Sequence, residues 1–407
     1  MTAIAWGRAL ERLWETMYVM FAVLSPRVAL SYVDGRSCRF VAMWLLACCF
    51  LVACMVVLGG YTRLSGSGLS MPSWQPIMGI LPPLSADDWL AHYRAYQATP
   101  EYRLMMSDLA SFKVIFWIEY SHRLLGRVLG LVFFLPLLFF AWQRYVTREW
   151  LVLFSVLFIL GALQGLMGWL MVYSGLVDEP QVSPYRLAAH LFLAFLLYGL
   201  LFSAMLRWMF PHGIQGEPTP SYPPHPYYTR DTLLTHIYVA FVLFAVTVIF
   251  GALVAGNHAG LIYNTYPLMD GSLLPPLDDG RGAWYQQMVT VPGPIQWVHR
   301  LLSFLTVLVL FALVYRIEKN RSTPPVIVWS ARSLFLVLIS QFSLGIATLL
   351  YGVPTLLALS HQFGALLLLS MMVWLMFAIK DYQHSFLASL PPPIDNPAQE
   401  SSSTGRF

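Results

Sequence analysis

Four histidines stand near the start of four long apolar runs, where side chains of this type can bind a metal. The runs contain "EYSHRLLGR" (119–127), "LAAHLFLAF" (187–195), "QWVHRLLSF" (296–304) and "LALSHQFGALL" (357–367), and the histidines are His122, His190, His299 and His361. An ionisable side chain inside a long apolar segment costs free energy and usually serves a function. The four histidines are therefore candidate metal ligands, and Glu119 is a candidate proton-handling group.

Composition indicates what kind of fold must position these residues. Of the 407 residues, 58% are hydrophobic and only 11% are charged, which leaves too little polar surface for a soluble globular protein. The chain is therefore predicted to be an integral membrane protein. No structural disulfide is expected, because the four cysteines lie in or just before one apolar run; they are Cys38, Cys48, Cys49 and Cys54.

Eight apolar runs are long enough to cross a bilayer, for which about 20 residues are needed. They lie near 41–61, 120–142, 150–173, 187–209, 232–255, 297–315, 328–350 and 355–379. Most of the 24 Lys and Arg residues fall in the two tails and the even-numbered connections, so the positive-inside rule places both termini in the cytoplasm. The connections 62–118 and 256–296 are then the two large outer loops.

The two halves of the chain repeat one another in sequence. Four matches occur in the same order in both halves: "PIMGILPP" (76–83) with "PLMDGSLLPP" (267–276), the Gly59-to-Gly68 spacing with Gly251-to-Gly260, "HRLL" at 122 and 299, and "QGLMG" (164–168) with "QFSLG" (341–345). Because each half has an even number of spans, the halves point the same way and are related by an axis along the membrane normal.

The predicted fold is an all-α integral membrane protein, with eight transmembrane helices forming two pseudo-repeated four-helix bundles. The predicted divisions are a cytoplasmic N-terminal tail 1–40, an N-terminal bundle 41–210, a Pro-rich cytoplasmic linker 211–231, a C-terminal bundle 232–380 and a cytoplasmic C-terminal tail 381–407.

This topology groups the four histidines into two pairs. Their spans all run from the outer side inward, so the imidazoles lie at similar depth near the outer face, one pair in each bundle. Zinc normally takes four protein ligands, or three and a water, and no cysteine or carboxylate cluster accompanies either pair. Two histidines on facing helices suit haem iron, to which the porphyrin already supplies four nitrogens. Gly126, Gly130 and Gly364 lie on the histidine faces and leave room for a flat macrocycle or a close helix.

Two arginines directly follow histidines. Arg123 and Arg300 point about 100° away from the preceding side chain around the helix, toward the surface. Haem propionates are carboxylates at such a surface and Arg is a preferred partner for them, although solvated anchoring explains each position equally well. Gln164 and Gln341 are expected to make hydrogen bonds between helices.

The two predicted sites differ at one position. Glu119 lies three residues before the first histidine, whereas the equivalent position before His299 is Gln296. Electron transfer through a haem needs no carboxylate, so Glu119 indicates proton handling or charge stabilisation in the first bundle. The alternative is a surface carboxylate paired with Arg123 or Lys113. The asymmetry predicts a reacting first site and an electron-transfer haem in the second.

Several stretches resemble the haem A synthase family of mitochondria and related bacteria. They are "GGYTRLSGSGLSM" (59–71), "PSWQPIMGILPP" (72–83), "PEYR" (100–103), "FKVIFWIEYSHRLLGR" (112–127) and the later histidine-headed spans, and the resemblance covers about residues 41–380. The first and fourth stretches are the specific ones. Ser111 departs from the acidic residue expected before Phe112, and the paired loop cysteines of some bacterial relatives are missing, as in the cysteine-free subgroup.

The resemblance implies an oxidoreductase that converts the methyl group at porphyrin position 8 of haem O to the formyl group of haem A. By the same resemblance, the oxygen would come from water or dioxygen and the electrons from outside the chain. Substrate haem O is implied between His122 and His190, with Glu119 close to the methyl. One haem b is implied between His299 and His361.

Further expectations follow from the same resemblance. Arg63, Tyr61 and Trp74 would cap the first site and position propionates. The protein would lie in the bacterial inner membrane and supply haem A to terminal oxidases. Its expected partners are haem O and haem A, the haem O synthase (protohaem farnesyltransferase), an electron donor and the lipid bilayer, but no nucleic acid; a homo-oligomer is left open.

Two other classes of function fit part of the sequence. A di-haem b-type membrane electron carrier would explain the histidine pairs, but it leaves Glu119 and the stretch 59–71 without a role. A transporter built of parallel repeats would explain the duplication, but not four histidines at one depth.

Overall fold

The computed structural model of the chain describes residues 35–73, 78–176, 181–214, 230–277, 282–321 and 323–389. Most of the predicted N-terminal tail, linker and C-terminal tail lies outside the described residues, as does Trp74. The boundaries predicted for these divisions therefore stay predictions.

All eight predicted spans are helices, and no β-strand occurs in the described residues, which confirms the all-α membrane class. The long helices are α2 Gly35–Leu64, α5 Leu109–Trp142, α6 Arg148–Ser174, α7 Pro184–Met209, α8 Arg230–Gly256, α10 Pro292–Lys319, α11 Pro325–Leu350 and α12 Thr355–Ser389. Each is long and apolar enough to cross a membrane.

Helix α5 begins eleven residues before the predicted span at 120. Asp108 caps this helix by accepting a hydrogen bond from the backbone N–H of Ser111 at 2.8 Å. The added turns contain Lys113 and Glu119, which a hydropathy criterion excludes from an apolar run. Glu119 therefore lies well inside a regular helix rather than at its first turn.

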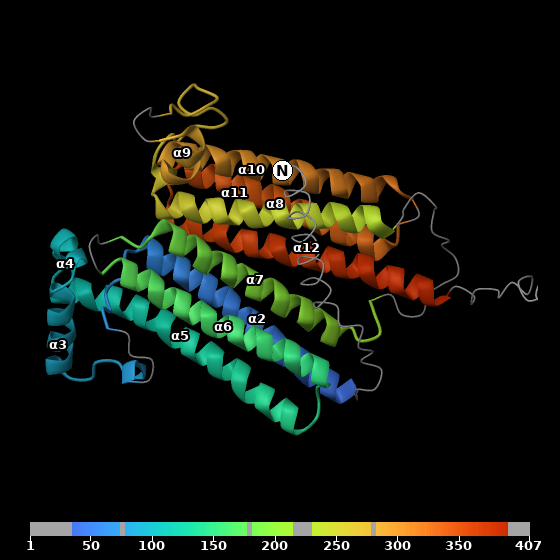
Figure 1. Cartoon of the computed structure of the whole chain (residues 1–407), viewed down its shortest axis with the longest axis horizontal. Coiled ribbons are helices and arrows are strands. Elements are labelled where there is room, and N and C mark those ends of the chain that lie inside the picture. The colour runs from blue at the N-terminus through green and yellow to red at the C-terminus, as the bar shows by residue number, and fades with distance from the viewer. Residues whose placement is uncertain are drawn as a thin grey trace, which may run out of the picture.

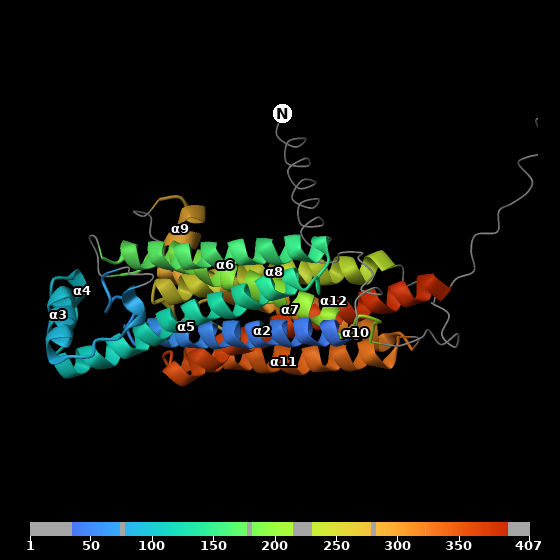
Figure 2. The same ribbon diagram turned by 90° about the horizontal axis from the view of Figure 1, so that it is seen from below.

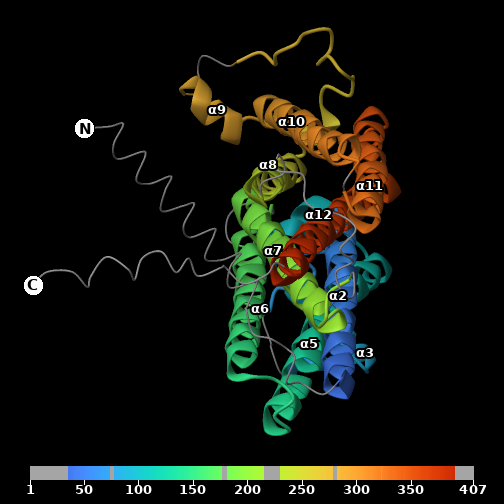
Figure 3. The same cartoon turned by 90° about the vertical axis from the view of Figure 1, so that its right-hand side faces the viewer.

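Each half forms a ring of four helices, as the end-on view in Figure 3 shows. In the first half α2 contacts α5 and α7, and α6 contacts the same two helices. In the second half α8 contacts α10 and α12, and α11 contacts the same two. The rings correspond helix by helix in chain order, and they meet where α7 packs on α8, α12 on α2, and α7 on α12.

The core runs through the junction of the two rings, where α7 and α12 lie. Of the 18 most apolar consecutive residues in α12, 67% are buried, against 11% of those in α11 at the edge of the molecule. The outward faces of the peripheral helices carry large apolar side chains, for example Phe50, Leu131 and Leu336. Such faces are stable only against lipid, which agrees with a multi-pass membrane protein.

Short helices cover one end of both bundles, called here the loop end. In the first half these are α3 Ala86–Gln97 and α4 Pro100–Met105, which lie across the start of α5, and in the second half α9 Trp284–Thr290 (Figures 1 and 2). The cap of α3 is a Ser85–Asp88 capping box, and Thr99 caps α4. Helices α3 and α4 pack on α5 through the loop-end aromatic cluster. This cluster comprises Met71, Tyr96, Phe112, Phe116 and Tyr120 with partly buried Trp89, Tyr93 and Tyr102.

Candidate functional site: two histidine pairs in matching bundles

The structure brings the four predicted histidines together in two pairs. His122 on α5 and His190 on α7 come from helices that stand across the first ring from one another, and they are close enough to interact electrostatically. His299 on α10 and His361 on α12 hold the same relation in the second ring. The structure therefore brings together the residues that the topology inferred from the sequence pairs, and their role as ligands stays a prediction.

Each imidazole lies against a glycine on the neighbouring helix. A Cβ at Gly59 of α2 would lie 3.1 Å from His122, and a Cβ at Gly168 of α6 would lie 3.2 Å from His190. In the second ring a Cβ at Gly251 of α8 would lie 3.0 Å from His299, and one at Gly345 of α11 would lie 2.7 Å from His361.

This arrangement fits a haem in each ring. The two imidazoles of each ring come from helices on one diagonal, and the helices on the other diagonal place glycines against them, which keeps side-chain bulk away from a pair of imidazoles that could hold haem iron. Among the described residues no three His, Cys, Asp or Glu side chains gather to hold a metal ion, so each pair offers two imidazoles, fewer donors than a zinc ion normally takes.

The glycines that sequence reasoning chose for this purpose are not the ones beside the histidines. A Cβ at Gly126 would make an ordinary contact with Met55, Gly130 has open space, and Gly364 faces the side chain of Gln341. The signal for the correct glycines was present, because Gly59 and Gly251, and Gly168 and Gly345, are members of the internal repeat. Only the packing of α2, α6, α8 and α11 on the histidine-bearing helices shows what these glycines contact.

In the second ring both histidines are oriented by the backbone. His299 Nδ1 lies 3.1 Å from the carbonyl of Thr247, and His361 Nδ1 lies 3.2 Å from the carbonyl of Gln341. A carbonyl only accepts, so Nδ1 carries the proton in each ring and donates it. In a neutral imidazole Nε2 is then the unprotonated nitrogen, which is the form that binds a metal.

The first ring lacks this support. The side-chain Nε2 of Gln164 donates to the carbonyl of His190 at 3.0 Å and lies 3.3 Å from His190 Nε2. The buried Nδ1 of His190 has no partner among the described residues, and His122 makes no hydrogen bond within them. The bond from Gln164 links α6 to α7, as expected from the sequence, but it also reaches the nitrogen that would bind a metal.

Glu119 is buried, with 2% of its surface exposed, and three donor atoms hold its carboxylate. Its Oε2 accepts from the Ser70 hydroxyl at 2.7 Å and the Met71 N–H at 2.9 Å, while its Oε1 pairs with Arg123. Arg123 also donates to the carbonyls of Met71 and Ser73. The pairing with Arg123 weighed from the sequence is present, but the pair is buried under the first loop rather than at the surface.

In the second ring Gln296 takes the place of Glu119, and its hydrogen bonds to the loop backbone run in the opposite direction. Gln296 donates to the carbonyls of Ala259 and Ile262 at 2.8 and 2.6 Å, and its Oε1 accepts from Arg300. Arg300 also donates to the carbonyl of Tyr263, the counterpart of Met71 in the repeat. The carboxylate of the first ring faces loop donors, whereas the amide of the second faces loop acceptors.

Comparison with known proteins follows this geometry. The model of the COX15–CtaA cytochrome oxidase assembly proteins matches residues 42–373. The chain belongs to the COX15–CtaA family. A family member from Nitrosospira multiformis, named heme A synthase, is 44% identical over 348 residues, covering 82% of this chain and 92% of its own. Proteins of the same name from Paramagnetospirillum magneticum and Rickettsia bellii (strain RML369-C) are 43% and 38% identical, over 83% of this chain and 92% and 98% of theirs.

The family stretch 59–71 joins the two rings. Arg63, at the end of α2, donates to the carbonyl of Ala255 at the end of α8, and its guanidinium lies 3.2 Å from Nε2 of His258. Burial, and then the nearby Arg63, lower the pKa of His258, so this imidazole is neutral at pH 7 and accepts the bond. Arg63, Arg123 and Arg300 all donate to backbone carbonyls here; propionate binding by them stays a prediction.

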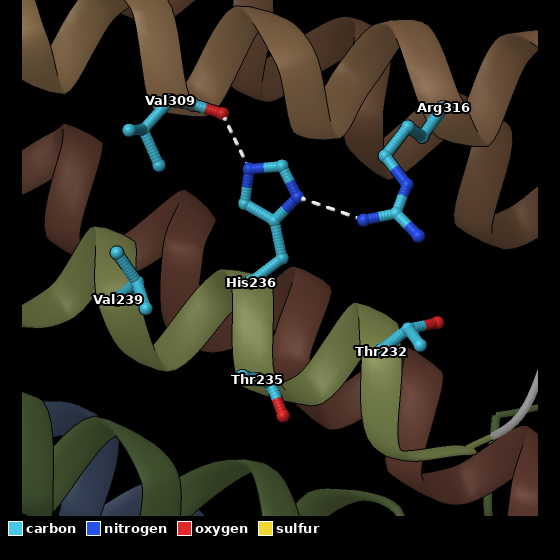
Figure 4. A pocket seen from close by; sticks show the side chains of 6 residues that line it. All are labelled: Thr232, Thr235, His236, Val239, Val309 and Arg316. Carbon is cyan, nitrogen blue, oxygen red and sulfur yellow. Dashed lines mark hydrogen bonds between the residues drawn. The ribbon is translucent and has the colours of Figure 1, made fainter.

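His236 is a histidine outside both pairs. It stands near the start of α8, where Nε2 donates to the carbonyl of Val309 at 2.9 Å and Nδ1 lies 3.3 Å from Arg316 (Figure 4). An open cleft of about 460 Å³ surrounds it, lined also by Thr232, Thr235 and Val239. Because carbonyl and guanidinium satisfy both ring nitrogens, this histidine links α8 to α10 rather than offering a free ligand.

Proposed function

We propose that the chain catalyses the haem A synthase reaction, the oxidation of the position 8 methyl group of haem O to the formyl group of haem A. Family membership and the activity named for relatives at 38–44% identity support this reaction. The structural observation that carries it is the asymmetry between two otherwise matching histidine sites. Only the first has a buried carboxylate, Glu119, one turn from a histidine, which a pure electron carrier does not need.

Substrate haem O is assigned to His122 and His190, and one resident haem b to His299 and His361. The support is the difference in orientation of the two pairs. Backbone carbonyls fix both histidines of the second ring for permanent ligation. In the first ring ligation competes with a Gln164 hydrogen bond, and such a site suits a molecule that must enter and leave. When bound, haem b supplies one-electron transfer to or from the first site.

The residues of the chain perform the remaining tasks. Glu119 holds or moves a proton close to the methyl group, and Arg123 with the Ser70 hydroxyl and the Met71 N–H keeps its carboxyl in place. Arg123 also ties the loop backbone at Met71 and Ser73 over the site. This loop and the loop-end aromatic cluster exclude bulk water from the reacting group.

The placement in the cell is part of the proposal. The distribution of Lys and Arg supports an inner-membrane protein with cytoplasmic termini and the loop end on the outer side. Haem O would be received from the protohaem farnesyltransferase, and electrons from an external donor would pass through the second ring. The bundles 41–210 and 232–380 would then be the substrate and haem b domains.

The haem content of the purified protein tests the proposal. The chain is expressed with the farnesyltransferase in a host that makes no haem A of its own, and extracted haems are separated and weighed by mass spectrometry. Haem B together with haem O and haem A is the expected result. Haem B alone, with no haem A in the membranes, would instead support the di-haem electron carrier, and no haem at all would support the transporter.

A further inference from the structure

A second carboxyl is buried beside the proposed reacting site and has no role in the account above. Glu101, the second residue of α4, is 7% exposed, and its Oε2 has no hydrogen-bond partner among the described residues. Burying a carboxylate without a partner is costly, so such a group keeps its proton. A carboxyl with a purely structural role would be expected to have its oxygens satisfied, as those of Glu119 are.

The fold brings Glu101 and Glu119 to the same loop-end aromatic cluster, because Tyr102, next to Glu101, and Met71, whose N–H binds Glu119, both belong to it. Thr99 and Pro100 fix the start of α4, and Tyr96 and Tyr102 on either side of Glu101 in sequence pack in the loop-end aromatic cluster on α5. Burial, and then the charge of Glu119, raise the pKa of Glu101 to about 8. Tyr96 of α3 has its own pKa raised by burial and by Glu101. Tyr93 of α3 and Tyr120 of α5 also lie in this cluster.

Glu101 therefore differs from an ordinary glutamate in its charge at neutral pH. A raised pKa means that Glu101 is protonated below about pH 8 and loses its proton above it. Glu119 is ion-paired with Arg123 and accepts two further hydrogen bonds.

We propose that Glu101 is the proton-exchange partner of Glu119, connecting the reacting site to water at the loop end. The proposal rests on the function proposed above, because oxidation of a methyl group at this site requires protons to move whatever the oxygen source. Glu119 is 2% exposed and enclosed by Ser70, Met71 and Arg123, so a proton leaving it needs a second acceptor close by. Glu101 meets this need by releasing its own proton to water at the loop end and then accepting the proton from Glu119.

A competing route exists and is part of the test. A cavity of about 80 Å³ lies against Arg123 and is lined also by His92, Arg127 and Ser73. It is large enough to hold water. A proton relay through this cavity would use His92 and would leave Glu101 without a role.

Carbodiimide labelling tests the pair independently of activity. Dicyclohexylcarbodiimide reacts with protonated carboxyls in apolar surroundings, and peptide mass spectrometry locates the adduct. In the full-length protein in detergent we expect labelling of Glu101 that is lost with a midpoint near pH 8. Glu119→Gln removes the neighbouring charge, so the midpoint at Glu101 should move to lower pH. No labelling of Glu101 at pH 7, or a midpoint unchanged by Glu119→Gln, would overturn the coupling.

Haem profiles test the consequence for the reaction. Glu101→Gln keeps the shape but cannot exchange a proton, so haem A formation should fall about 10-fold or more, with haem O or a hydroxylated intermediate accumulating. Glu101→Asp should recover part of the rate, and the inflection near pH 8 in the parent's rate should be missing in Glu101→Gln. The matched control is Asp87→Asn, an exposed carboxyl of α3, which should behave as the parent. Retained haem b absorbance shows that each variant is folded.

The outcomes separate the two proposals. A normal haem A yield and pH profile in Glu101→Gln, or a deficit in His92→Ala instead, would overturn the role of Glu101 while leaving the synthase function intact. A parent protein that makes no haem A, yet shows the coupled labelling, would overturn the synthase function and with it this role, while leaving the coupling of the two carboxyls established.

Discussion

In the second ring His299 and His361 each donate Nδ1–H to a carbonyl of a neighbouring helix, whereas in the first ring neither His122 nor His190 has such a bond within the described residues. The helices, the glycines against the imidazoles and the order of packing are the same in both rings. A duplicated scaffold can therefore serve two purposes when only the hydrogen bonds around its histidines change. Fixed imidazoles suit a permanent cofactor, and less constrained ones suit a substrate.

The two related contacts between the rings, which we call seams, also differ in their hydrogen bonding. Gln362, next to His361, donates across the α12–α2 seam to the carbonyl of Val56 at 2.8 Å and lies against Gly60. The related α8–α7 seam is apolar, with Ala252 packed in a cluster that includes Leu191, the residue after His190. The hydrogen bond from Gln362 to Val56 thus joins two segments. One is the part of α2 that carries Gly59, which lies against His122, and the other is the part of α12 that carries His361.

The largest effect is expected when a histidine is removed from either ring. His299→Ala or His361→Ala should abolish the haem b spectrum, because a bis-histidine haem loses an axial ligand. His122→Ala or His190→Ala should keep that spectrum and lose haem O binding and haem A formation. Optical spectra and extracted haems report both. An unchanged six-coordinate haem b in both His299→Ala and His361→Ala would refute the assignment of the rings.

The next largest effect is expected from the carboxylate. Glu119→Gln keeps the size of the side chain but loses the charge and the titratable proton, so the rate of haem A formation should fall on the order of 100-fold or more. Haem b should remain, and haem O or a hydroxylated intermediate should accumulate. A normal yield of haem A would show that Glu119 acts only in its ion pair with Arg123.

The reverse substitution in the second ring, Gln296→Glu, tests the difference between the two loops. Gln296→Glu would place a carboxylate against the carbonyls of Ala259 and Ile262, which now accept from the amide. Loss of two buried hydrogen bonds and repulsion between acceptors should destabilise the second ring by about 3 kcal/mol, partly offset by Arg300. Thermal loss of haem b absorbance measures this. Equal stability of variant and parent would mean that the loop backbone rearranges to donate.

The smallest effect is expected at the paired glutamines. Gln164→Leu frees the ring of His190, so haem O affinity should change by about 10-fold or less while haem b stays bound. Gln341→Leu is the matched control, since the Oε1 of Gln341 has no partner among the described residues and only its backbone carbonyl orients His361. A larger loss in Gln341→Leu than in Gln164→Leu would contradict the difference drawn between the rings.

The sequence by itself determined the class, the number of spans, the repeat and the four histidines. Composition and run length suffice for helices in a membrane, because backbone polar groups there must be satisfied within each helix. The repeat and the even number of spans per half then put all four histidines at one depth. Glu119 stood out because its counterpart in the repeat is Gln296.

Tertiary structure alone decided which residues surround these histidines. Hydrogen bonds from His299 and His361 go to backbone carbonyls, which every residue has and which no sequence pattern marks. The same holds for Arg63, which was expected over the first site but donates to the carbonyl of Ala255 in the other half. Glu101 is buried within reach of the charge of Glu119 only because α4 folds back over α5, a contact set by aromatic packing between segments distant in the chain. Local patterns specify helices and their faces, but the partner of each face depends on how the rings close, and that is fixed by packing of the whole molecule.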